Sequence, residues 1–433
     1  MREERPLTYH TVTLGALTRD GLARTEITEP GPDGEARSTV LQVSAGLPGE
    51  RVTIAVEAAA TPPKRRKRHW KPYPRRVEIT QIHQPSPLRI SASCPVFGIC
   101  GGCQLQHLSY PSQLEWKSSI VRELLVEVGH FSEPPLLAPV ACEHPWHYRN
   151  HMRFSVNREG QPGLTARGTH RVLPLTHCPI AHEHVNTALE LFSQQVNPRP
   201  QVLIRCGTAT RQMLVQPQQS PEVEAKLAET GLELCTETME EQLCGETFRI
   251  RPSSFFQTNT MQAEKMTQMV LAGLFPAADE VSRQTSGRPS IVLDAYCGVG
   301  TFALMLSRHA GRVIAIEESA SSIKDARWNL REVENVEILQ GKVEDLLPAL
   351  AEQLDGLVID PPRAGCQRQV LEALVRNPVR RIVYVSCEPS TLARDLDILC
   401  HAYTTYHLSS VQPLDMFPQT AHIECVALLE LNS

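Results

Sequence analysis

The C-terminal part of the chain alternates short apolar runs with polar segments of helical length. The apolar runs lie at residues 291–300, 312–319, 336–341, 355–362 and 380–388. Strands that alternate with helices predict a parallel, doubly wound sheet. Two later apolar segments, at residues 403–413 and 422–431, are expected to add antiparallel edge strands.

The preceding residues follow a different pattern. Residues 8–58 combine β-branched residues in alternation with Gly and Pro at turns, which predicts a small β-barrel. Residues 147–250 are again strand-like, and residues 113–128 have a helical pattern. The predicted fold class is therefore α/β plus β. The expected parts are a β-barrel over residues 1–60, a basic linker over 61–80, a central mixed domain over 81–253 and an α/β domain over 254–433.

Charge and composition narrow the function. The chain has 433 residues and a net charge of −5, so its overall charge does not indicate nucleic-acid binding. Residues 63–76 differ, because eight Lys or Arg occur there with Trp70, Tyr73 and no acidic residue. This tract indicates either RNA contact or a solvated linker. No apolar run approaches the roughly 18 residues of a membrane span, and the N-terminus lacks a signal-peptide pattern. We expect a cytoplasmic monomer without a membrane partner.

A glycine-rich turn follows the first strand of the α/β domain. Residues 292–302 read VLDAYCGVGTF, and glycines at such a turn let a ligand approach the backbone. The next strand ends in Glu317, whose carboxylate is placed to accept hydrogen bonds from ribose hydroxyls. Nicotinamide enzymes share both features. The rigid loop DPPR at residues 360–363 favours a methyltransferase, because such loops are typical of methyltransferases that act on bases or amides.

The fifth strand of this domain ends at a cysteine. Cys387 lies between that strand and a helix expected to start near Pro389. A thiolate at a helix N-terminus is stabilised by the helix dipole, although a lone cysteine is more often a small buried hydrophobe. Glu424 leads into the last apolar segment, where partial desolvation would make its carboxylate a stronger base. The two residues are candidates for a nucleophile and its partner base.

Four other cysteines form a separate pattern. Cys94, Cys100 and Cys103 are close in sequence, and Cys178 precedes a proline far along the chain. A disulfide framework is not expected in a long chain of this kind with an odd total of 13 cysteines. Four thiolates suit zinc, but the unequal spacing better suits an iron–sulfur cluster. Spacing alone leaves both open.

Several motifs, taken in order, resemble the RNA (uracil-5-)-methyltransferase family. They are SFFQTN (254–259), DAYCGVGTF (294–302), DPPRAG (360–365), VSCEPSTLARDL (385–396) and DMFPQTAHIE (415–424). The segment CPVFGICGGCQLQHL (94–108) with Cys178 is similar to the iron–sulfur motif of the 23S ribosomal RNA branch, and LPGERV (47–52) resembles its N-terminal TRAM barrel. The resemblance implies a TRAM barrel, a central domain with a 4Fe-4S cluster and a Rossmann-like methyltransferase domain. The cluster ligands would be Cys94, Cys100, Cys103 and Cys178.

The same resemblance assigns the site residues. Cys387 would be the nucleophile and Glu424 the proton acceptor. Contacts to S-adenosylmethionine would come from Gln257, Tyr296, Thr301, Glu317 and Asp360. Thr301 stands where some relatives have Asn, and the match near Lys342 is weak. The implied reaction is methylation of carbon 5 of a uridine, because a thiolate that adds to carbon 6 makes carbon 5 enolate-like.

The implied substrate is 23S ribosomal RNA, because members specific for transfer RNA commonly lack both the barrel and the cluster.

Four other functions fit parts of the sequence. A transfer RNA uracil-5-methyltransferase would share the catalytic motifs. A nitrogen methyltransferase would typically carry an aromatic residue in place of Arg363, and an RNA cytosine-5 methyltransferase a cysteine nearer to Asp360 than Cys366. A non-catalytic RNA-binding iron–sulfur protein fits the barrel, but gives no reason for both Cys387 and Glu424.

Overall fold

The structure of the chain is a computed structural model that describes residues 5–30, 35–58, 75–276, 290–350 and 353–432. Its contacts divide the chain into two compact units. The first unit contains the residues up to Gln113 together with residues 163–173 and 419–421. The second unit contains residues 114–162, 174–418 and 422–433.

The N-terminal part of the first unit is built on five antiparallel strands. β4 pairs with β1 on one side and β5 on the other, while β2 pairs with β3. The bounds are β1 Leu7–Thr13, β2 Ala23–Pro30, β3 Ala36–Val43, β4 Arg51–Glu57 and β5 Val77–Gln84. Alternate residues such as Val43, Val52 and Ile54 pack into one hydrophobic cluster. Because β5 belongs to this sheet region, the strands extend past residue 60, where the sequence pattern placed the end of the barrel.

Most of the basic tract lies outside the described residues, which omit residues 59–74. Its last two arginines are described. Arg75 donates from Nη1 and Nη2 to the two carboxylate oxygens of Glu29 at 2.6 and 2.7 Å, and this pair lowers the pKa of Glu29. Arg76 Nε donates to Glu78 at 2.6 Å. These two arginines therefore form ion pairs with carboxylates of β2 and β5.

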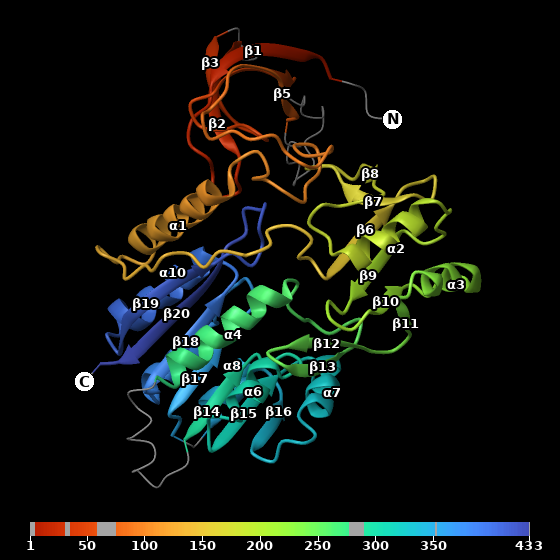
Figure 1. Ribbon diagram of the computed structural model, residues 1–433. Coiled ribbons are helices and arrows are strands. Elements are labelled where there is room, and N and C mark those ends of the chain that lie inside the picture. The colour runs from red at the N-terminus through yellow and green to blue at the C-terminus, as the bar shows by residue number, and fades with distance from the viewer. Residues whose placement is uncertain (1–4, 31–34, 59–74, 277–289, 351–352, 433) are drawn as a thin grey trace, which may run out of the picture. The chain divides into compact units, whose positions relative to one another are not determined.

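The second unit contains a seven-stranded sheet in the order β16-β15-β14-β17-β18-β20-β19 (Figure 1). The bounds are β14 Ile291–Ala295, β15 Arg312–Glu317, β16 Val336–Gln340, β17 Gly356–Ile359, β18 Arg381–Ser386, β19 Tyr406–Leu414 and β20 Glu424–Leu431. The first five are parallel, and β20 is antiparallel to both β18 and β19. This confirms the Rossmann-like sheet and its antiparallel edge. The strand order reverses between β14 and β17, which is where such sheets bind ligands.

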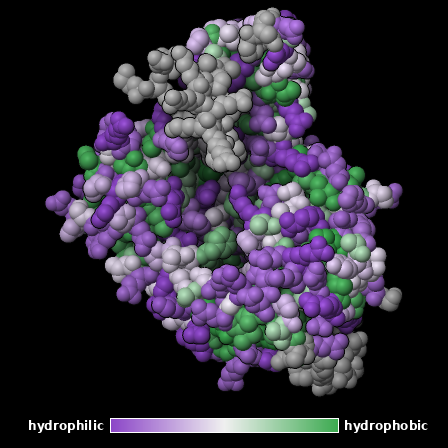
Figure 2. All heavy atoms as spheres, turned by 180° about the vertical axis from the view of Figure 1, so that it is seen from behind, coloured by the Kyte–Doolittle hydropathy of each residue, from purple (hydrophilic) through white to green (hydrophobic). Residues whose placement is uncertain are grey.

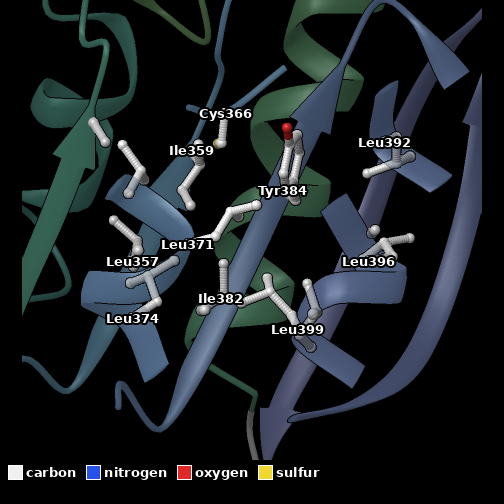
Figure 3. Close-up of a cluster of buried hydrophobic side chains, with 14 of the residues drawn as sticks. Leu357, Ile359, Cys366, Leu371, Leu374, Ile382, Tyr384, Leu392, Leu396 and Leu399 are labelled. Carbon is white, nitrogen blue, oxygen red and sulfur yellow. The ribbon is translucent and has the colours of Figure 1, made fainter. Parts of the chain in front are cut away.

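Helices cover both faces of this sheet. One face packs against α1 (Tyr110–Glu127), α8 (Val343–Leu346), α9 (Arg368–Arg376) and α10 (Pro389–Asp397). The other packs against α4 (Thr260–Leu274), α6 (Thr301–Leu306) and α7 (Ala320–Asn329). Figure 3 shows the first face, where Ile382 and Tyr384 of β18 lie among leucines of α9 and α10. Burial on both faces explains why these strands are continuous apolar runs.

The central region has mixed structure, as its sequence pattern predicted. In the second unit, β6 pairs with β9, β9 with β10 and β10 with β11, and β12 forms a hairpin with β13. The bounds are β6 His151–Val156, β7 Pro162–Thr165, β8 Val172–Pro174, α2 Glu183–Ser193, β9 Gln201–Cys206, β10 Gln212–Gln216, α3 Pro221–Glu229, β11 Glu233–Cys235, β12 Met239–Leu243 and β13 Glu246–Ile250.

Hydrophilic residues predominate on the face shown in Figure 2, and hydrophobic residues occur there in scattered groups. Within the described ranges, no helix combines the length and the hydropathy that a membrane span requires.

Candidate active site

Four predicted site residues lie at one edge of the seven-stranded sheet. Tyr296 follows β14, Glu317 ends β15, Asp360 follows β17 and Cys387 follows β18. Because these strands are parallel neighbours, their carboxyl ends share one edge. All four residues are half-buried. A ligand at this edge therefore has access to each of them.

Cys387 and Glu424 are brought together by strand pairing. β18 and β20 are antiparallel, and Ser386 is the register partner of Cys425. Continuing this register by one residue places Cys387 opposite Glu424. The start of β20 thus returns Glu424 to the edge where the parallel strands end. The pairing joins two residues whose motifs are far apart in the sequence.

The environment of Cys387 favours the neutral thiol. Its pKa is raised to about 11, chiefly by burial and also by the negative charges of Glu424 and Asp360, while Arg363 opposes this rise. The expected stabilisation of the thiolate by the helix dipole is therefore outweighed. Burial also raises the pKa of Glu424 well above its usual range. Arg363 was not among the predicted site residues, although its place directly after the two prolines was a usable signal.

The alkylation rate of Cys387 reports this environment. We expect the rate with iodoacetamide to rise about tenfold per pH unit below the raised pKa, because the thiolate is the reactive form. Arg363→Gln should raise the pKa further and slow the reaction at any given pH. Mass spectrometry of the Cys387 peptide across a pH series measures both effects. Arg376→Gln, at an exposed position on α9, is the control, and equal rates in the two variants would contradict the assigned role of Arg363.

The glycine-rich turn is organised around Glu317. Gly298 N–H donates to Glu317 Oε2 at 3.0 Å, and Ser319 N–H donates to Oε1 at 2.6 Å. Tyr296 takes a left-handed backbone conformation with φ of 64°, which is uncommon for a non-glycine residue and typical of functional turns. Gly300, with φ of 87°, precedes α6, whose first residue is Thr301. The turn therefore joins Tyr296, Glu317 and Thr301 in one local structure.

Several carboxylates gather at this edge, and Arg363 offsets part of their charge. Burial raises the pKa of Asp294 to about 8, and the negative charges of Asp360 and Glu317 contribute to this rise. Burial likewise raises the pKa of Asp360 to about 7. Such a group of acids suits a positively charged ligand, and S-adenosylmethionine is one because it carries a sulfonium. Asp294 was not among the predicted site residues.

Gln257 is placed by a different element from the other predicted cofactor contacts. It precedes α4 and is half-buried. Its carbonyl oxygen accepts a hydrogen bond from Asn150 Nδ2 at 2.9 Å. Asn259 caps α4 by accepting from the backbone N–H of Gln262 at 3.3 Å. The motif around Gln257 is thus fixed by a helix start and by the central strands, rather than by the sheet edge itself.

The segment that leads to Glu424 is anchored by a buried ion pair. Lys117 Nζ of α1 donates to Asp415 Oδ1 at 2.6 Å and to the carbonyl oxygen of Phe417 at 3.0 Å. The Lys117 and Asp415 side chains are 2% and 1% exposed. Asn259, which caps α4, donates to the carbonyl of Met416, and Gln262 of α4 donates to the carbonyl of Asp415. These contacts position the chain just before the proposed base.

Removal of one partner of the buried Lys117–Asp415 ion pair should destabilise the fold. We expect Lys117→Met to lower the free energy of unfolding by about 3–5 kcal/mol, because Asp415 keeps a buried charge without its cation. Urea unfolding followed by circular dichroism measures the loss. Lys117→Met with Asp415→Asn should recover part of it. Arg368→Met is the control, because it removes only an exposed ion pair with Glu372 and should change the free energy of unfolding little. Equal losses in Lys117→Met and Arg368→Met would contradict the interpretation.

A second buried network holds the loop that carries Asp360 and Arg363. Asp395 Oδ2 of α10 accepts hydrogen bonds from Tyr384 Oη at 2.7 Å and from Cys366 N–H at 2.8 Å. Arg394 donates to the other oxygen of Asp395 and to the carbonyl of Ala364. Tyr384 and Cys366 lie side by side in Figure 3. The network ties β18, α10 and the proline loop together beneath the reactive edge.

The cysteines of the iron–sulfur motif are divided between the two units. Cys94, Cys100 and Cys103 belong to the first unit and Cys178 to the second. Phe97 N–H donates to the Cys94 carbonyl at 3.1 Å, so the chain turns tightly after Cys94. Gly102 N–H donates to Cys100 Sγ at 3.4 Å, a contact that stabilises a thiolate ligand. The local structure thus suits metal-bound sulfur at Cys100.

The fold and the site define a methyltransferase of the Rossmann-like class. Over residues 225–432 the chain matches the family described as tRNA (uracil-5-)-methyltransferase. It is 37% identical to an uncharacterized RNA methyltransferase of Gloeobacter violaceus, over 96% of this chain and 98% of the relative. It is 32% identical to one of Listeria monocytogenes, over 82% of this chain and 87% of the relative. The chain belongs to the RNA (uracil-5-)-methyltransferase family and is an RNA methyltransferase that uses S-adenosylmethionine.

A solved structure shares this fold along nearly the whole chain. The tRNA (uracil-54, C5)-methyltransferase of Pyrococcus abyssi, in complex with S-adenosyl-L-homocysteine, has a TM-score of 0.67 and 23% sequence identity. The likeness covers 97% of this chain and 100% of the archaeal chain.

Proposed function

We propose that the chain methylates carbon 5 of a uridine in 23S ribosomal RNA through a covalent adduct of Cys387. The observation that supports this most directly is the β18–β20 register, which sets Cys387 opposite Glu424. A thiol nucleophile and a carboxylate base on adjacent strands suit a reaction that makes and breaks one covalent bond and removes one proton.

Cys387 and Glu424 act in sequence. The Cys387 thiol gives its proton to solvent, and its sulfur then bonds to carbon 6 of the uracil ring, which gives carbon 5 enolate character. S-adenosylmethionine supplies a methyl group on a positively charged sulfur. Glu424 then takes the proton from the methylated carbon 5, the electron pair re-forms the double bond between carbons 5 and 6, and the bond from sulfur to carbon 6 breaks. The high pKa of Glu424 suits this step, because it makes the carboxylate a stronger base.

The residues proposed for the cofactor fit its charge and its hydroxyl groups. Glu317 would accept hydrogen bonds from the ribose, and Asp360 would add negative charge to the edge that takes the cationic cofactor. The remaining proposed contacts are Gln257, Tyr296 and Thr301. The mutual repulsion of the carboxylates at this edge is relieved when a cationic ligand binds, which supports S-adenosylmethionine over a neutral cofactor.

Cys94, Cys100, Cys103 and Cys178 are proposed to hold a 4Fe-4S cluster, and the five N-terminal strands to form a TRAM barrel. The N–H donor to Cys100 and the tight turn after Cys94 support the cluster. No reaction step uses it, so its role is structural. An anaerobic preparation with almost no iron per chain would refute it.

The ribosomal substrate rests on the barrel and on the cysteine motif. Transfer RNA is the second candidate, because the archaeal enzyme that shares the fold over its full length acts on tRNA. The two are separated by incubating the protein and S-adenosylmethionine with 23S ribosomal RNA or transfer RNA transcripts. The RNA that gains a methyl group, and the uridine that carries it, identify the substrate.

The covalent mechanism is tested with RNA that contains 5-fluorouridine. Fluorine cannot leave as a cation, so the adduct with Cys387 should accumulate as a protein–RNA complex stable to denaturing electrophoresis. A peptide map should place the link at Cys387. Methylation of normal RNA without any trapped complex would overturn the proposed mechanism.

A further inference from the structure

Three potential metal ligands meet in the central region, apart from the residues assigned to catalysis and to the iron–sulfur motif. The ligand atoms of His182, His184 and Cys206 all lie within 4.8 Å of one another. Cys206 Sγ is 3.7 Å from His182 Nδ1. His182 is the residue that caps α2, His184 lies in the first turn of that helix, and Cys206 ends β9. Two rigid elements thus converge on this group.

Both histidines are half-buried. His184 Nδ1 is buried and has no hydrogen-bond partner among the described residues. The backbone of Gly207 hydrogen-bonds the same ring, an outer contact of the kind that orients metal-binding histidines. A buried nitrogen with an unused lone pair is costly unless something binds it.

Cys206 completes the group. Its side chain is almost fully buried, and its sulfur donates to the carbonyl oxygen of Asn150 at 3.4 Å. The backbone of Val185 also hydrogen-bonds the sulfur. A bound cation would offset the cost of a buried thiolate, since metals bind the deprotonated sulfur.

We propose that His182, His184 and Cys206 bind one divalent transition-metal ion of the zinc type. Two imidazoles and a thiolate match the ligand preference of Zn²⁺, whereas Mg²⁺ and Ca²⁺ prefer oxygen ligands. Binding forms a sulfur–metal bond and two nitrogen–metal bonds, and the thiol proton of Cys206 goes to solvent. The weak capping bond from His184 N–H to His182 Nδ1, at 3.2 Å, is replaced. A water molecule fills the fourth position.

The ion would act as a structural link. It joins the end of β9 to the start of α2. The carbonyl of Asn150 also accepts the backbone N–H of Cys206 at 2.9 Å, and Asn150 Nδ2 donates to the carbonyl of Gln257 at 2.9 Å. The metal therefore stabilises the strand pair that supports the segment around Gln257.

A neighbouring group offers a matched comparison. His147, His177 and Glu183 also bring their ligand atoms within 4.8 Å. His147 Nδ1 already pairs with Glu183 at 3.0 Å and contacts the Ala181 carbonyl at 3.2 Å. Glu183 and His177 are exposed to solvent. We therefore do not expect this group to bind a metal ion. His177→Gln serves as the control for the variants of the proposed zinc site.

The test measures zinc and iron per chain by mass spectrometry in the full-length protein, after loading with Zn²⁺ and dialysis. We expect one zinc ion per chain in the wild type and in His177→Gln, and its loss in Cys206→Ser and His184→Gln. Iron should stay unchanged in all four proteins, which separates this site from the iron–sulfur motif. Titration with Co²⁺ should show a sulfur-to-cobalt absorption band that Cys206→Ser lacks.

Circular dichroism tests whether the variants are folded. If Cys206→Ser does not fold, zinc retention in folded His184→Gln decides the question. A wild type that binds no zinc, or zinc lost from His177→Gln but kept by the other two variants, would overturn the proposal. Methylation activity plays no part in the readout, so this outcome is independent of the proposed reaction.

Discussion

Cys387→Ala should give a folded protein that forms neither an adduct nor a methylated product. Alanine has no nucleophilic atom, and carbon 5 of an unactivated uracil is too poor a nucleophile to take the methyl group. We expect the methylation rate to fall by roughly 10⁴-fold or more, as it does when covalent nucleophiles are removed from other enzymes. Cys387 is half-buried at the end of β18, so the shorter side chain leaves no large cavity.

The measurement is transfer of a labelled methyl group from S-adenosylmethionine to RNA, together with trapping on 5-fluorouridine RNA. Cys400→Ala is the matched control, because Cys400 is another half-buried cysteine of the same unit. It should methylate and trap like the wild type. Product formation by Cys387→Ala at a rate near that of Cys400→Ala would exclude Cys387 as the nucleophile.

The sequence predicted the features that depend on neighbouring residues. Each apolar run from Ile291 onward became a strand of the large sheet, because a run buried on both faces needs no alternation with polar residues. The helical pattern at residues 113–128 matches most of α1. Glu317 and Cys387 were placed at strand ends from local pattern alone, and the structure has them there.

The features that the sequence did not reveal depend on distant residues. Cys387 and Glu424 lie opposite each other because of the register of β20 against β18, and no local sequence pattern encodes this register. Lys117 and Asp415, 298 positions apart, pair only because α1 packs on the same unit as the last strands. The pKa of Cys387 was expected to fall by the helix dipole. It rises instead, because burial and the carboxylates from β17 and β20 outweigh that effect.

Glu424→Gln should separate methyl transfer from release. The amide keeps the shape of the side chain but cannot accept the proton of carbon 5, so the 5,6 double bond cannot re-form and the sulfur cannot leave. We expect normal RNA to accumulate as a methylated covalent complex with the variant. Denaturing electrophoresis with a labelled methyl group detects that complex. Glu430→Gln is the control, because Glu430 lies on the same strand but forms an ion pair with Arg381, and this variant should turn over and release product. Release of methylated product by Glu424→Gln would rule out Glu424 as the base.

The stability of the same variant provides a check on this interpretation. Burial raises the pKa of Glu424 in the folded state, so between the unfolded and the folded pKa values the native state binds more protons than the unfolded state. Stability should therefore fall as pH rises through this interval, and the ionised, buried carboxylate destabilises the wild type above it. Glu424→Gln lacks this penalty and should unfold at a temperature no lower than the wild type, with a difference that grows from acid to neutral pH. A trapped complex in a variant at least as stable as the wild type can then be attributed to the missing base, because unfolding does not account for it.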